Sequence, residues 1–414
     1  MIDIALLRDN PDAVRKSLRD RNLNPKLTDD FLAIDDEWRK ATSTLDKARA
    51  ELNRVSKERD VEKGKTAKTR VKSLEADVTG FEKRRDELLL QFPNVPLAEV
   101  PIGKDETENV VLRRWGEPRK EKPEDYLALA ERLDLIDIAR AGKVSGSRFG
   151  YLKNEAVLLE FALVRFAFDL AVKEGFIPVI PPVLVKPEMM LGMGKVKFIE
   201  GDDAFFLPKD NLYLVGSAEH TIGPMHAGEI FEEKDLPRRY IGFSTSFRRE
   251  AGSYGKDTRG ILRVHQFDKA ELFSFTKPED SAKEHEFLIA FQEKFMQALG
   301  LPYQVVQICT GDMGFPDARQ VDIETWMPSE GKYRETSSAS NTTDYQARGL
   351  NIKYKPTAGD KQQKTQFVHM LNATAVSQRP IIMILENYQT KDGGVEMPKA
   401  LQSYLGFKKI EPHK

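Results

Sequence analysis

The feature that most constrains the fold is a heptad repeat of apolar residues near the amino terminus. From residue 30 onward these residues step by three and four positions, as in a coiled-coil helix. The first series comprises Phe31, Ile34, Trp38, Ala41, Leu45, Ala48, Leu52 and Val55. After an interruption at 62–66 a second series runs from Ala67 to Phe92, with Arg85 at one apolar position. Two such faces can bury each other by folding back, so residues 30–92 are predicted to form an antiparallel helical hairpin with its turn at Gly64.

The part of this hairpin nearest the turn carries an excess of basic residues. The formal charge of the whole chain is only −1, so any binding to nucleic acid has to come from local patches. One interpretation of the basic end is a solvated coiled-coil face, and the other is a surface that contacts a phosphate backbone. The residues proposed for such contacts are Arg54, Lys57, Lys63, Lys65, Lys68 and Arg70.

The remainder of the chain predicts an α+β fold. The expected strands follow one another through short connections, with no regular strand–helix alternation and no GxGxxG or GxxxxGK[ST] motif. This pattern favours an antiparallel β-sheet flanked by helices over a dinucleotide-binding or P-loop fold. The run 175–185 contains several prolines, which suit an edge strand or an interface. The expected strands are 109–115, 204–207, 212–215, 240–244, 303–309, 318–326, 333–338 and 365–370.

Changes in pattern divide the chain into three parts. Residues 1–100 are predicted to form an N-terminal domain, which opens with a short helix within residues 1–24 and carries the arm at about 30–92. Residues 101–125 are rich in Pro and Gly and are predicted to be a linker. Residues 126–414 are predicted to form the second and larger domain.

A charged hairpin is predicted at residues 246–273. Arg248, Arg249 and Glu250 end its first strand, a glycine-rich loop follows, and the second strand begins near Arg263 and Phe267. Guanidinium groups suit phosphates, a carboxylate suits an amino group and an aromatic ring suits the face of a base. The hairpin could therefore bind a nucleotide, although a solvated hairpin with surface ion pairs has the same residue types.

Several classes of protein are excluded by the composition. The single cysteine, Cys309, allows no disulfide framework and fits a reducing compartment, so the cytoplasm is the expected location. Cys309 stands in an apolar run and is expected to be buried. No apolar run approaches the length of a membrane span. The six histidines show no metal-ligand spacing, so no zinc site is expected.

Five ordered motifs resemble those of the seryl-tRNA synthetases, which are class II aminoacyl-tRNA synthetases. The segment GSAEH at 216–220 resembles the family's amino-acid-binding segment, and residues 247–272 resemble its motif 2. RETSSASNTTDYQAR at 334–348 and LNATAVSQR at 371–379 resemble the two parts of motif 3, the second of them followed by LENYQ at 385–389. Pro182 stands where motif 1 keeps a proline. The order of helical arm, linker and antiparallel catalytic domain is that of the family.

The resemblance implies a serine–tRNA ligase. Such an enzyme activates L-serine with ATP to seryl-adenylate, releases pyrophosphate and transfers the seryl group to the 3′ end of tRNA(Ser). It implies Mg²⁺ bound together with ATP, a homodimer and a tRNA-binding role for the arm. Whether tRNA(Sec) is also an acceptor stays open.

The resemblance also assigns roles to individual residues. Arg248, Glu335 and Arg379 would be catalytic, and Glu335 with Ser338 would hold the Mg²⁺ through ATP. Glu250 and Phe267 would contact adenine, while Arg263 and Arg379 would hold the outer phosphates. The full ATP-binding set is Arg248, Arg249, Glu250, Arg263, Val264, His265, Gln266, Phe267, Glu335, Thr336, Ser337, Ser338 and Arg379. The serine-binding set is Ser217, Ala218, Glu219, Arg248, Glu271, Asn372 and Thr374.

Four departures from the family pattern stand out. Ser217 replaces the usual threonine, and His220 and Thr221 replace residues that are apolar in many members. The 371–379 segment is one residue shorter than usual, and the arm is short at its tip. Three other interpretations remain: a ligase that charges a carrier protein, a binding paralogue without catalysis and a structural coiled coil. The glycine-rich loop, with Lys256 and Arg259, is expected to meet the acceptor end of the tRNA.

Overall fold

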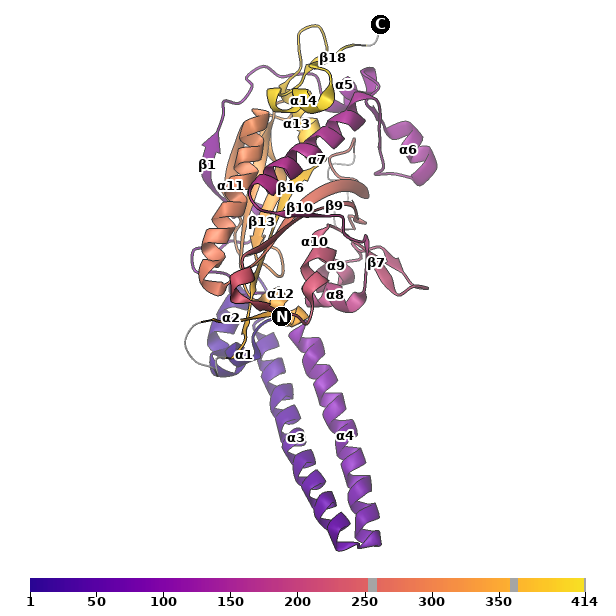
Figure 1. Ribbon diagram of the computed structural model, residues 1–414, viewed down its shortest axis with the longest axis vertical. Helices are drawn as coiled ribbons and strands as arrows, with labels where there is room; N and C mark the ends of the chain where they lie inside the picture. Colours follow the sequence, from indigo (N-terminus) through magenta and orange to yellow (C-terminus); the bar gives the residue numbers. More distant parts are fainter. Residues whose placement is uncertain (252–258, 358–363, 413–414) are drawn as a thin grey trace. The chain divides into compact units, whose positions relative to one another are not determined.

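The computed structural model describes residues 1–251, 259–357 and 364–412. The chain forms two compact units, Met1–Val95 and Pro96–Lys414 (Figure 1). None of the helices in the described part of the chain is both long and apolar enough to cross a membrane.

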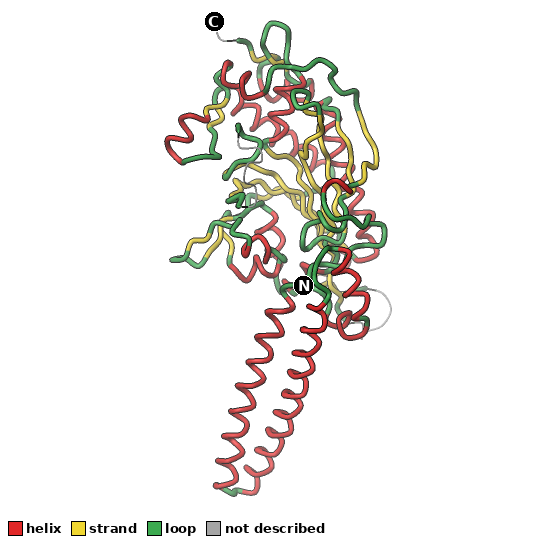
Figure 2. The backbone as a smooth tube through the Cα atoms, turned by 180° about the vertical axis from the view of Figure 1, so that it is seen from behind, coloured by secondary structure: helices red, strands yellow, loops and turns green. Residues whose placement is uncertain are grey.

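The first unit is helical. It consists of α1 (Ile4–Asp9), α2 (Pro11–Asp20), α3 (Lys26–Glu58) and α4 (Val61–Leu89). Where one short helix was predicted in residues 1–24, there are two, because the side chain of Asn10 caps α2 and Pro11 occupies its first position. Helices α3 and α4 lie side by side and antiparallel (Figure 2), which confirms the predicted helical hairpin.

The turn of the hairpin is not at the predicted place. Helix α3 ends at Arg59, whose φ of 58° is left-handed, and α4 begins after Asp60, whose side chain accepts a hydrogen bond from the Lys63 amide. Gly64 therefore lies inside α4, and the predicted break at 62–66 is wrong. The capping chemistry of Asp60 decided the position of the turn, whereas a glycine inside a helix is tolerated at a cost of about 1 kcal/mol.

The polar residue in the apolar repeat has a partner on the facing helix. The guanidinium carbon of Arg85 lies 4.2 Å from the centroid of the Trp38 ring. A cation over an indole face is a favourable contact. Arg85 therefore keeps its place in the repeat by covering the ring with its side chain.

The second unit is built on an eight-stranded sheet with the order β1-β11-β12-β13-β16-β10-β9-β4. All neighbours are antiparallel except β4 and β9, so the predicted antiparallel sheet is confirmed. The strands are β1 (Val110–Trp115), β4 (Ile177–Val179), β9 (Arg238–Phe247), β10 (Gln266–Thr276), β11 (Tyr303–Gln307), β12 (Arg319–Met327), β13 (Lys332–Asn341) and β16 (His369–Ser377).

One predicted strand is displaced in the structure. The last strand of the sheet runs over His369–Ser377, whereas residues 366–367 form a separate short strand, so the predicted strand at 365–370 is wrong in its bounds. The full strand was not predicted because its polar residues Asn372 and Thr374, which face a pocket, interrupt the apolar pattern of a buried strand. The strand predicted at 109–115 is confirmed as β1, the outermost strand, and it lies within the segment 101–125 that was predicted to be a linker. The proline-containing strand β4 lies at the opposite edge, as predicted.

One face of the sheet is covered by helices α7 (Glu155–Lys173) and α11 (Ser281–Leu299), with α13 (Arg379–Asn387) near β12 (Figure 1). Leu163, Phe295 and Ile382 of these helices pack on Leu272 and Ala373 of the sheet in one apolar core. Cys309 is fully buried, as predicted. On the other face, Phe273 and Phe275 of β10 pack in a second apolar cluster with Ala218 and Ala347, and polar side chains occupy the rest of that face around a pocket.

Smaller elements surround this sheet. The short helices are α5 (Tyr126–Arg132), α6 (Ile138–Ser145), α8 (Pro187–Gly192), α9 (Val196–Glu200), α10 (Glu219–Ile222), α12 (Tyr345–Leu350) and α14 (Gln402–Leu405). The 3-10 helices are η1 (Glu106–Glu108), η2 (Gly223–His226), η3 (Glu233–Asp235), η4 (Pro278–Asp280) and η5 (Lys399–Leu401). The short strands are β2 (Ile136–Asp137), β3 (Tyr151–Leu152), β5 (Leu184–Val185), β6 (Phe206–Leu207), β7 (Leu212–Leu214), β8 (Ile230–Glu232), β14 (Lys353–Lys355), β15 (Gln366–Phe367), β17 (Val395–Glu396) and β18 (Lys409–Ile410).

Candidate active site

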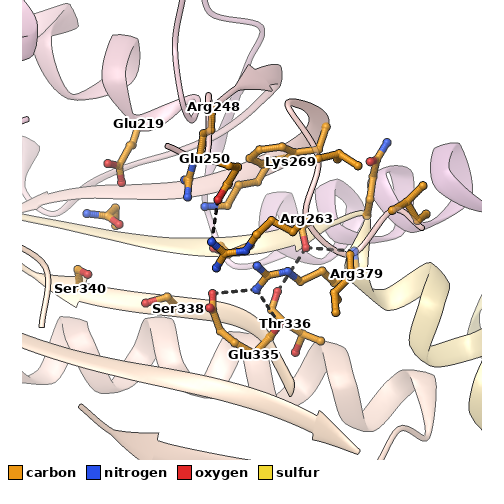
Figure 3. Close-up of a pocket in the computed structure, with 18 of the residues that line it drawn as sticks. Glu219, Arg248, Glu250, Arg263, Lys269, Glu335, Thr336, Ser338, Ser340 and Arg379 are labelled. Atoms are coloured by element: carbon orange, nitrogen blue, oxygen red, sulfur yellow. Dashed lines mark hydrogen bonds and ion pairs between the residues drawn. The ribbon is translucent and has the colours of Figure 1, made fainter. Parts of the chain in front are cut away.

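A pocket lies on the face of the sheet opposite the helices. On β10 the pocket residues Phe267 and Lys269 alternate with Ala270 and Leu272, which belong to the apolar core. Figure 3 shows charged and hydroxyl side chains converging on this space from several strands. The lining residues are Glu219, Arg248, Glu250, Ile261, Leu262, Arg263, Val264, Phe267, Lys269, Asp317, Gln320, Glu335, Thr336, Ser338, Ser340, Asn372, Thr374, Ser377, Gln378 and Arg379.

A β-bulge on β13 brings Glu335 to the pocket face. Ser338 pairs with Asp322 and Ser337 with Ile323, but the next partner, Glu324, pairs with Glu335. Thr336 is therefore an extra residue that has no register partner on β12. Beyond it the side chains of β13 change face by one position. Without the bulge, Glu335 would lie on the face opposite Ser338.

A second bulge does the same on β16. Glu271 of β10 pairs with Thr374 and Ala270 pairs with Val376, so Ala375 is the extra residue. Asn372 and Thr374 line the pocket, and beyond the bulge Ser377 lines it as well. Both strands that carry motif 3 thus change their alternation within the pocket.

Arg379 enters the pocket as the first residue of α13. Its Nη1 lies 3.1 Å from Oε1 of Glu335 and donates a 2.7 Å hydrogen bond to the carbonyl oxygen of the same residue. The Arg379 guanidinium holds the pKa of Glu335 below its ordinary value. The shortened 371–379 segment therefore leaves Arg379 within the pocket, paired with one of its acids.

A second guanidinium–carboxylate pair faces the first. Arg263 Nη1 donates a 2.8 Å hydrogen bond to Oε2 of Glu250 (Figure 3). Glu250 has a φ of 53°, in the left-handed region that non-glycine residues seldom adopt. This conformation at the end of β9 is sparsely populated, and such backbone tends to occur at binding sites.

Arg248 lies between the two ends of the pocket. Its Nε donates a 3.1 Å hydrogen bond to the carbonyl oxygen of Gly216, and its guanidinium carbon lies 5.5 Å from the Phe267 ring centroid. These contacts fix the side chain while it lines the pocket, so its charge is directed at the shared space.

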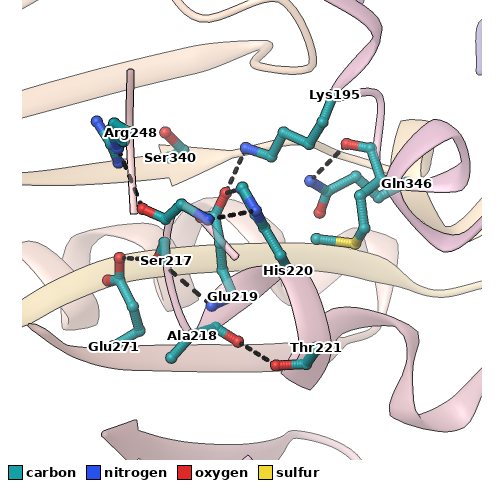
Figure 4. Close-up of polar contacts among 12 residues, drawn as sticks. Lys195, Ser217, Ala218, Glu219, His220, Thr221, Arg248, Glu271, Ser340 and Gln346 are labelled. Carbon is teal, nitrogen blue, oxygen red and sulfur yellow. Dashed lines mark hydrogen bonds and ion pairs between the residues drawn. The ribbon is translucent and has the colours of Figure 1, made fainter. Parts of the chain in front are cut away.

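Two buried carboxylates, those of Glu219 and Glu271, lie at the other end of the site (Figure 4). Ser217 Oγ donates a 2.6 Å hydrogen bond to Oε1 of Glu271, and the Lys269 ammonium pairs with the same oxygen. Glu271 is 1% exposed, and its Oε2 has no hydrogen-bond partner among the described residues. A buried acceptor without a partner is costly, so this atom has unused capacity to accept a hydrogen bond.

Some predicted site residues do not line this pocket. Arg249 turns away, donates to the Ala204 carbonyl oxygen and lies over the Phe205 ring. Gln266 is exposed, and Ser337 is buried on the helix-covered face beside Ile323. Four further predicted residues do not line the pocket: Ser217, Ala218 and Glu271 are buried, and His265 bonds the backbone of Arg248.

Other pocket residues were missed by the sequence analysis. Lys269 could have been found from the alternation of β10, since it stands between Phe267 and Glu271 at positions two apart. Ser340 and Gln378 lie within the two segments that resemble motif 3 but were not singled out, whereas Asp317 and Gln320 lie outside every motif and reach the pocket only through the fold.

Glu335 and Ser338 provide a carboxylate and a hydroxyl on the same strand face. Oxygen ligands of this kind suit Mg²⁺, which usually keeps waters and substrate phosphates as its other ligands. Within the described residues no cluster of three or more His, Cys, Asp or Glu side chains is placed to hold a metal by itself. The residues therefore fit a metal that arrives with a phosphate ligand.

The predicted RNA-contacting residues lie on the arm near its turn. Lys57, Lys65, Lys68 and Arg70 are exposed, while Arg54 pairs with Glu51 at 2.7 Å. Lys63, the sixth of these residues, pairs with Asp60 at 2.9 Å. Of the glycine-rich loop, Lys256 lies outside the described residues and Arg259 is exposed.

An antiparallel sheet with arginines and acids gathered on one face defines the catalytic core of a class II aminoacyl-tRNA synthetase. The family model described as "tRNA synthetase class II core domain (G, H, P, S and T)" matches residues 205–388. The model described as "Seryl-tRNA synthetase N-terminal domain" matches residues 1–96.

Comparison of the whole chain narrows the class further. The serine–tRNA ligase of Dictyoglomus turgidum is 42% identical over 429 residues, with full coverage of both chains. The seryl-tRNA synthetase of Pyrococcus horikoshii, solved in complex with ATP, is also 42% identical and superposes with a TM-score of 0.93 over all of both chains. The cytoplasmic serine–tRNA ligase of Naegleria fowleri, solved with AMP, is 33% identical with a TM-score of 0.89, covering 100% of this chain and 99% of its own. This chain belongs to the seryl-tRNA synthetase family, which confirms the resemblance of its motifs.

Proposed function

We propose that the pocket activates L-serine with ATP and that the seryl group then passes to the 3′ end of tRNA(Ser). The chain is an aminoacyl-tRNA synthetase, a serine–tRNA ligase. The observation that carries the proposal is the pocket itself. Arg248 stands between two guanidinium–carboxylate pairs at one end and, at the other, Glu219 and Lys269, the second of which pairs with the buried Glu271.

ATP binding is assigned to the end of the pocket with the paired guanidinium groups. Arg263 and Arg379 would hold the outer phosphates, and the carboxylates of Glu250 and Glu335 keep both side chains within the pocket. Phe267 would cover the adenine ring, and Glu250 would accept a hydrogen bond from the adenine amino group. Arginine suits this task because its planar fork binds phosphate oxygens in pairs.

The activation step needs no separate general base. An oxygen of the serine carboxylate forms a bond to the α-phosphorus, and the bond from phosphorus to the bridging oxygen breaks as pyrophosphate leaves. Arg248 would contact both the carboxylate and the α-phosphate, so it offsets the repulsion between two anions. Positioning and charge stabilisation of this kind supply most of the rate enhancement in phosphoryl and nucleotidyl transfer.

Glu335 and Ser338 would hold Mg²⁺ together with the phosphates. The ion supplies charge neutralisation at phosphate oxygens when it is bound. Because of the bulge, Glu335 and Ser338 lie on the same face of β13, which faces the pocket.

Serine selection is assigned to Glu271 and Glu219. The unpaired Oε2 of Glu271 would accept the hydrogen bond of the serine hydroxyl, and Glu219 would bind the ammonium. Asn372 and Thr374 line the same end. Alanine would leave Oε2 buried without a partner, which supports discrimination by the hydroxyl group.

The exposed basic residues of the arm support a role in tRNA binding, since a long exposed arm adds little to a core. A homodimer is supported by exposed apolar side chains on α7 and next to β4. Phe161 is 64% and Ile180 is 86% exposed, more than a monomer needs to show. A reducing location such as the cytoplasm agrees with the one buried cysteine.

Serine-dependent exchange of pyrophosphate into ATP tests the activation step, and charging of tRNA tests the transfer. Exchange with another amino acid but not with serine would refute the assignment of the pocket. Charging of tRNA by the chain without residues 30–92 as well as by the intact chain would refute the role of the arm. A carrier-protein ligase would show exchange and no charging of tRNA.

A further inference from the structure

Glu219 is a buried acid whose charge needs an explanation. Its side chain is 9% exposed, and it lines both the main pocket and a side chamber bounded by Lys195, His220 and residues 314–317. Moving a carboxylate out of water strongly favours its neutral form. A neutral Glu219 would bind the ammonium group of an amino acid poorly, so something has to keep it charged.

Lys195, at the start of α9, is the residue that keeps the Glu219 carboxylate charged. The Lys195 ammonium, whose side chain is 18% exposed, forms an ion pair with Oε1 of Glu219 (Figure 4). Burial by itself would raise the pKa of Glu219, but Lys195, with smaller contributions from His220 and Lys269, holds it well below its ordinary value.

His220 supplies a contact without a charge. Its Nδ1 accepts a 3.1 Å hydrogen bond from the Gly216 amide, which leaves the proton on Nε2, 3.5 Å from Oε1 of Glu219. Burial lowers the pKa of His220 to about 4, so the ring is neutral near pH 7. Lys195 is therefore the cation in direct contact with Glu219 in the described part of the chain.

Both contacts are with the same oxygen of Glu219. Oε1 is the oxygen of Glu219 closest to both Lys195 and His220, while the residue faces the pocket. The arrangement matches Glu271, whose Oε1 is held by Ser217 and Lys269 and whose Oε2 has no partner. Each acid is thus anchored through one oxygen and can present the other.

We propose that Lys195 is a positioning residue, which keeps Glu219 charged and oriented through Oε1 so that Oε2 binds the α-ammonium group of the amino-acid substrate. This inference rests on the proposed function and deepens it. It assigns to a residue outside the motifs the affinity for the ammonium end of serine.

The test compares Lys195→Met, Lys195→Arg and a matched control, Lys197→Met. Lys197 lies two positions away and pairs with Glu200 at 2.9 Å instead of with Glu219. The Michaelis constants for serine and for ATP and the turnover number are measured by pyrophosphate exchange at several values between about pH 6 and pH 8, where free serine keeps its ammonium group.

Lys195→Met is expected to raise the KM for serine about tenfold or more near neutral pH, because burial then favours the neutral form of Glu219, which binds an ammonium group poorly. The KM of this variant should rise further toward pH 6, while that of the native chain stays nearly constant. Lys195→Arg should restore most of the affinity, and Lys197→Met should behave like the native chain. The KM for ATP should change by less than about twofold in all variants, since Asp203, Arg248, Lys269 and Asp317 around Glu219 remain in each of them. Lys197 also lines the side chamber, so its replacement tests the loss of a nearby charge that is not paired with Glu219.

Two results would overturn the inference. An unchanged or lower KM for serine in Lys195→Met would mean that the ammonium of Lys195 has no effect or competes with the substrate. An increase with no dependence on pH would mean that Lys195 acts only through packing. Absence of serine-dependent exchange in the native chain would instead refute the proposed function, so the two failures are distinguishable.

Discussion

Ser217 Oγ donates a 2.6 Å hydrogen bond to Oε1 of Glu271, and both side chains are almost completely buried. The hydroxyl group of Ser217 thereby holds one oxygen of the acid that we assign to the serine hydroxyl. The residue does not line the pocket, so its effect on a substrate has to pass through Glu271.

Removal of this hydroxyl should weaken serine binding. Ser217→Ala leaves the Glu271 carboxylate with one donor fewer, and a hydrogen bond to a buried charged group is worth about 1.5–3 kcal/mol. We expect the KM for serine to rise roughly 10- to 100-fold in pyrophosphate exchange, with the KM for ATP nearly unchanged. Ser217→Thr keeps the hydroxyl and should retain most of the affinity. Equal losses in both variants would point to packing as the cause.

The ion pair of Arg379 and Glu335 predicts a dependence of stability on pH. Arg379 lowers the pKa of Glu335 in the folded state, so the pair adds stability that is fully present above the ordinary value of 4.5. That stability is lost as the pH falls through the folded-state pKa. The urea midpoint of the native chain minus that of Glu335→Gln should be constant above about pH 5 and shrink at lower pH. A difference that stays the same at about pH 3 would contradict the coupling.

The turn of the arm can be tested at Gly64. An added Cβ meets nothing within 4 Å, and Gly64 lies within α4. Gly64→Ala should therefore stabilise the start of this helix by about 1 kcal/mol. Hydrogen exchange of the amides near residue 64 should slow by about fivefold.

The control for this variant is Gly80→Ala, further along the same helix and equally open. It should slow exchange around residue 80 and leave the start of α4 unchanged. Faster exchange near residue 64 in Gly64→Ala would mean that the chain needs a glycine in the turn there.

The basic end of the arm predicts a dependence on salt. Changing Lys65, Lys68 and Arg70 together to Gln should weaken tRNA binding while pyrophosphate exchange stays unchanged. If each residue neutralises one phosphate, the slope of log K against log salt should fall by about two to three. The control changes the exposed residues Lys83 and Arg84, near the other end of α4, and should have a smaller effect. Equal effects of both sets would indicate that the arm attracts tRNA by its charge alone.

The sequence predicted the arm and the sheet because each leaves a repeated pattern. The heptad series from Phe31 to Val55 can bury its apolar side chains only against a second helix with a matching series. The motif 2 residues lie on the hairpin formed by β9 and β10. The sequence pattern gave the wrong prediction where a single local interaction determines the structure. Asp60 set the turn in place of Gly64, and Arg249 turned to the Phe205 ring.

The candidate site was predicted residue by residue only where motifs exist. Glu335 and Ser338 differ by three positions, and strict alternation would separate them, so only the bulge at Thr336 explains why both face the pocket. Lys195 has no motif at all, because its role depends on an ion pair formed across the fold. Such pairs leave no periodic signal in a sequence.

The two bulges have a consequence for how this chain can change in evolution. A substitution at Thr336 or Ala375 leaves the count of residues along each strand intact, so the neighbours keep their faces. Deletion of either residue would instead exchange inside and outside for every position from there to the end of the strand. The catalytic strands should therefore be more sensitive to a change in length than to a replacement at these two positions, and related chains that lack one of these residues would have to carry a compensating insertion before the strand ends.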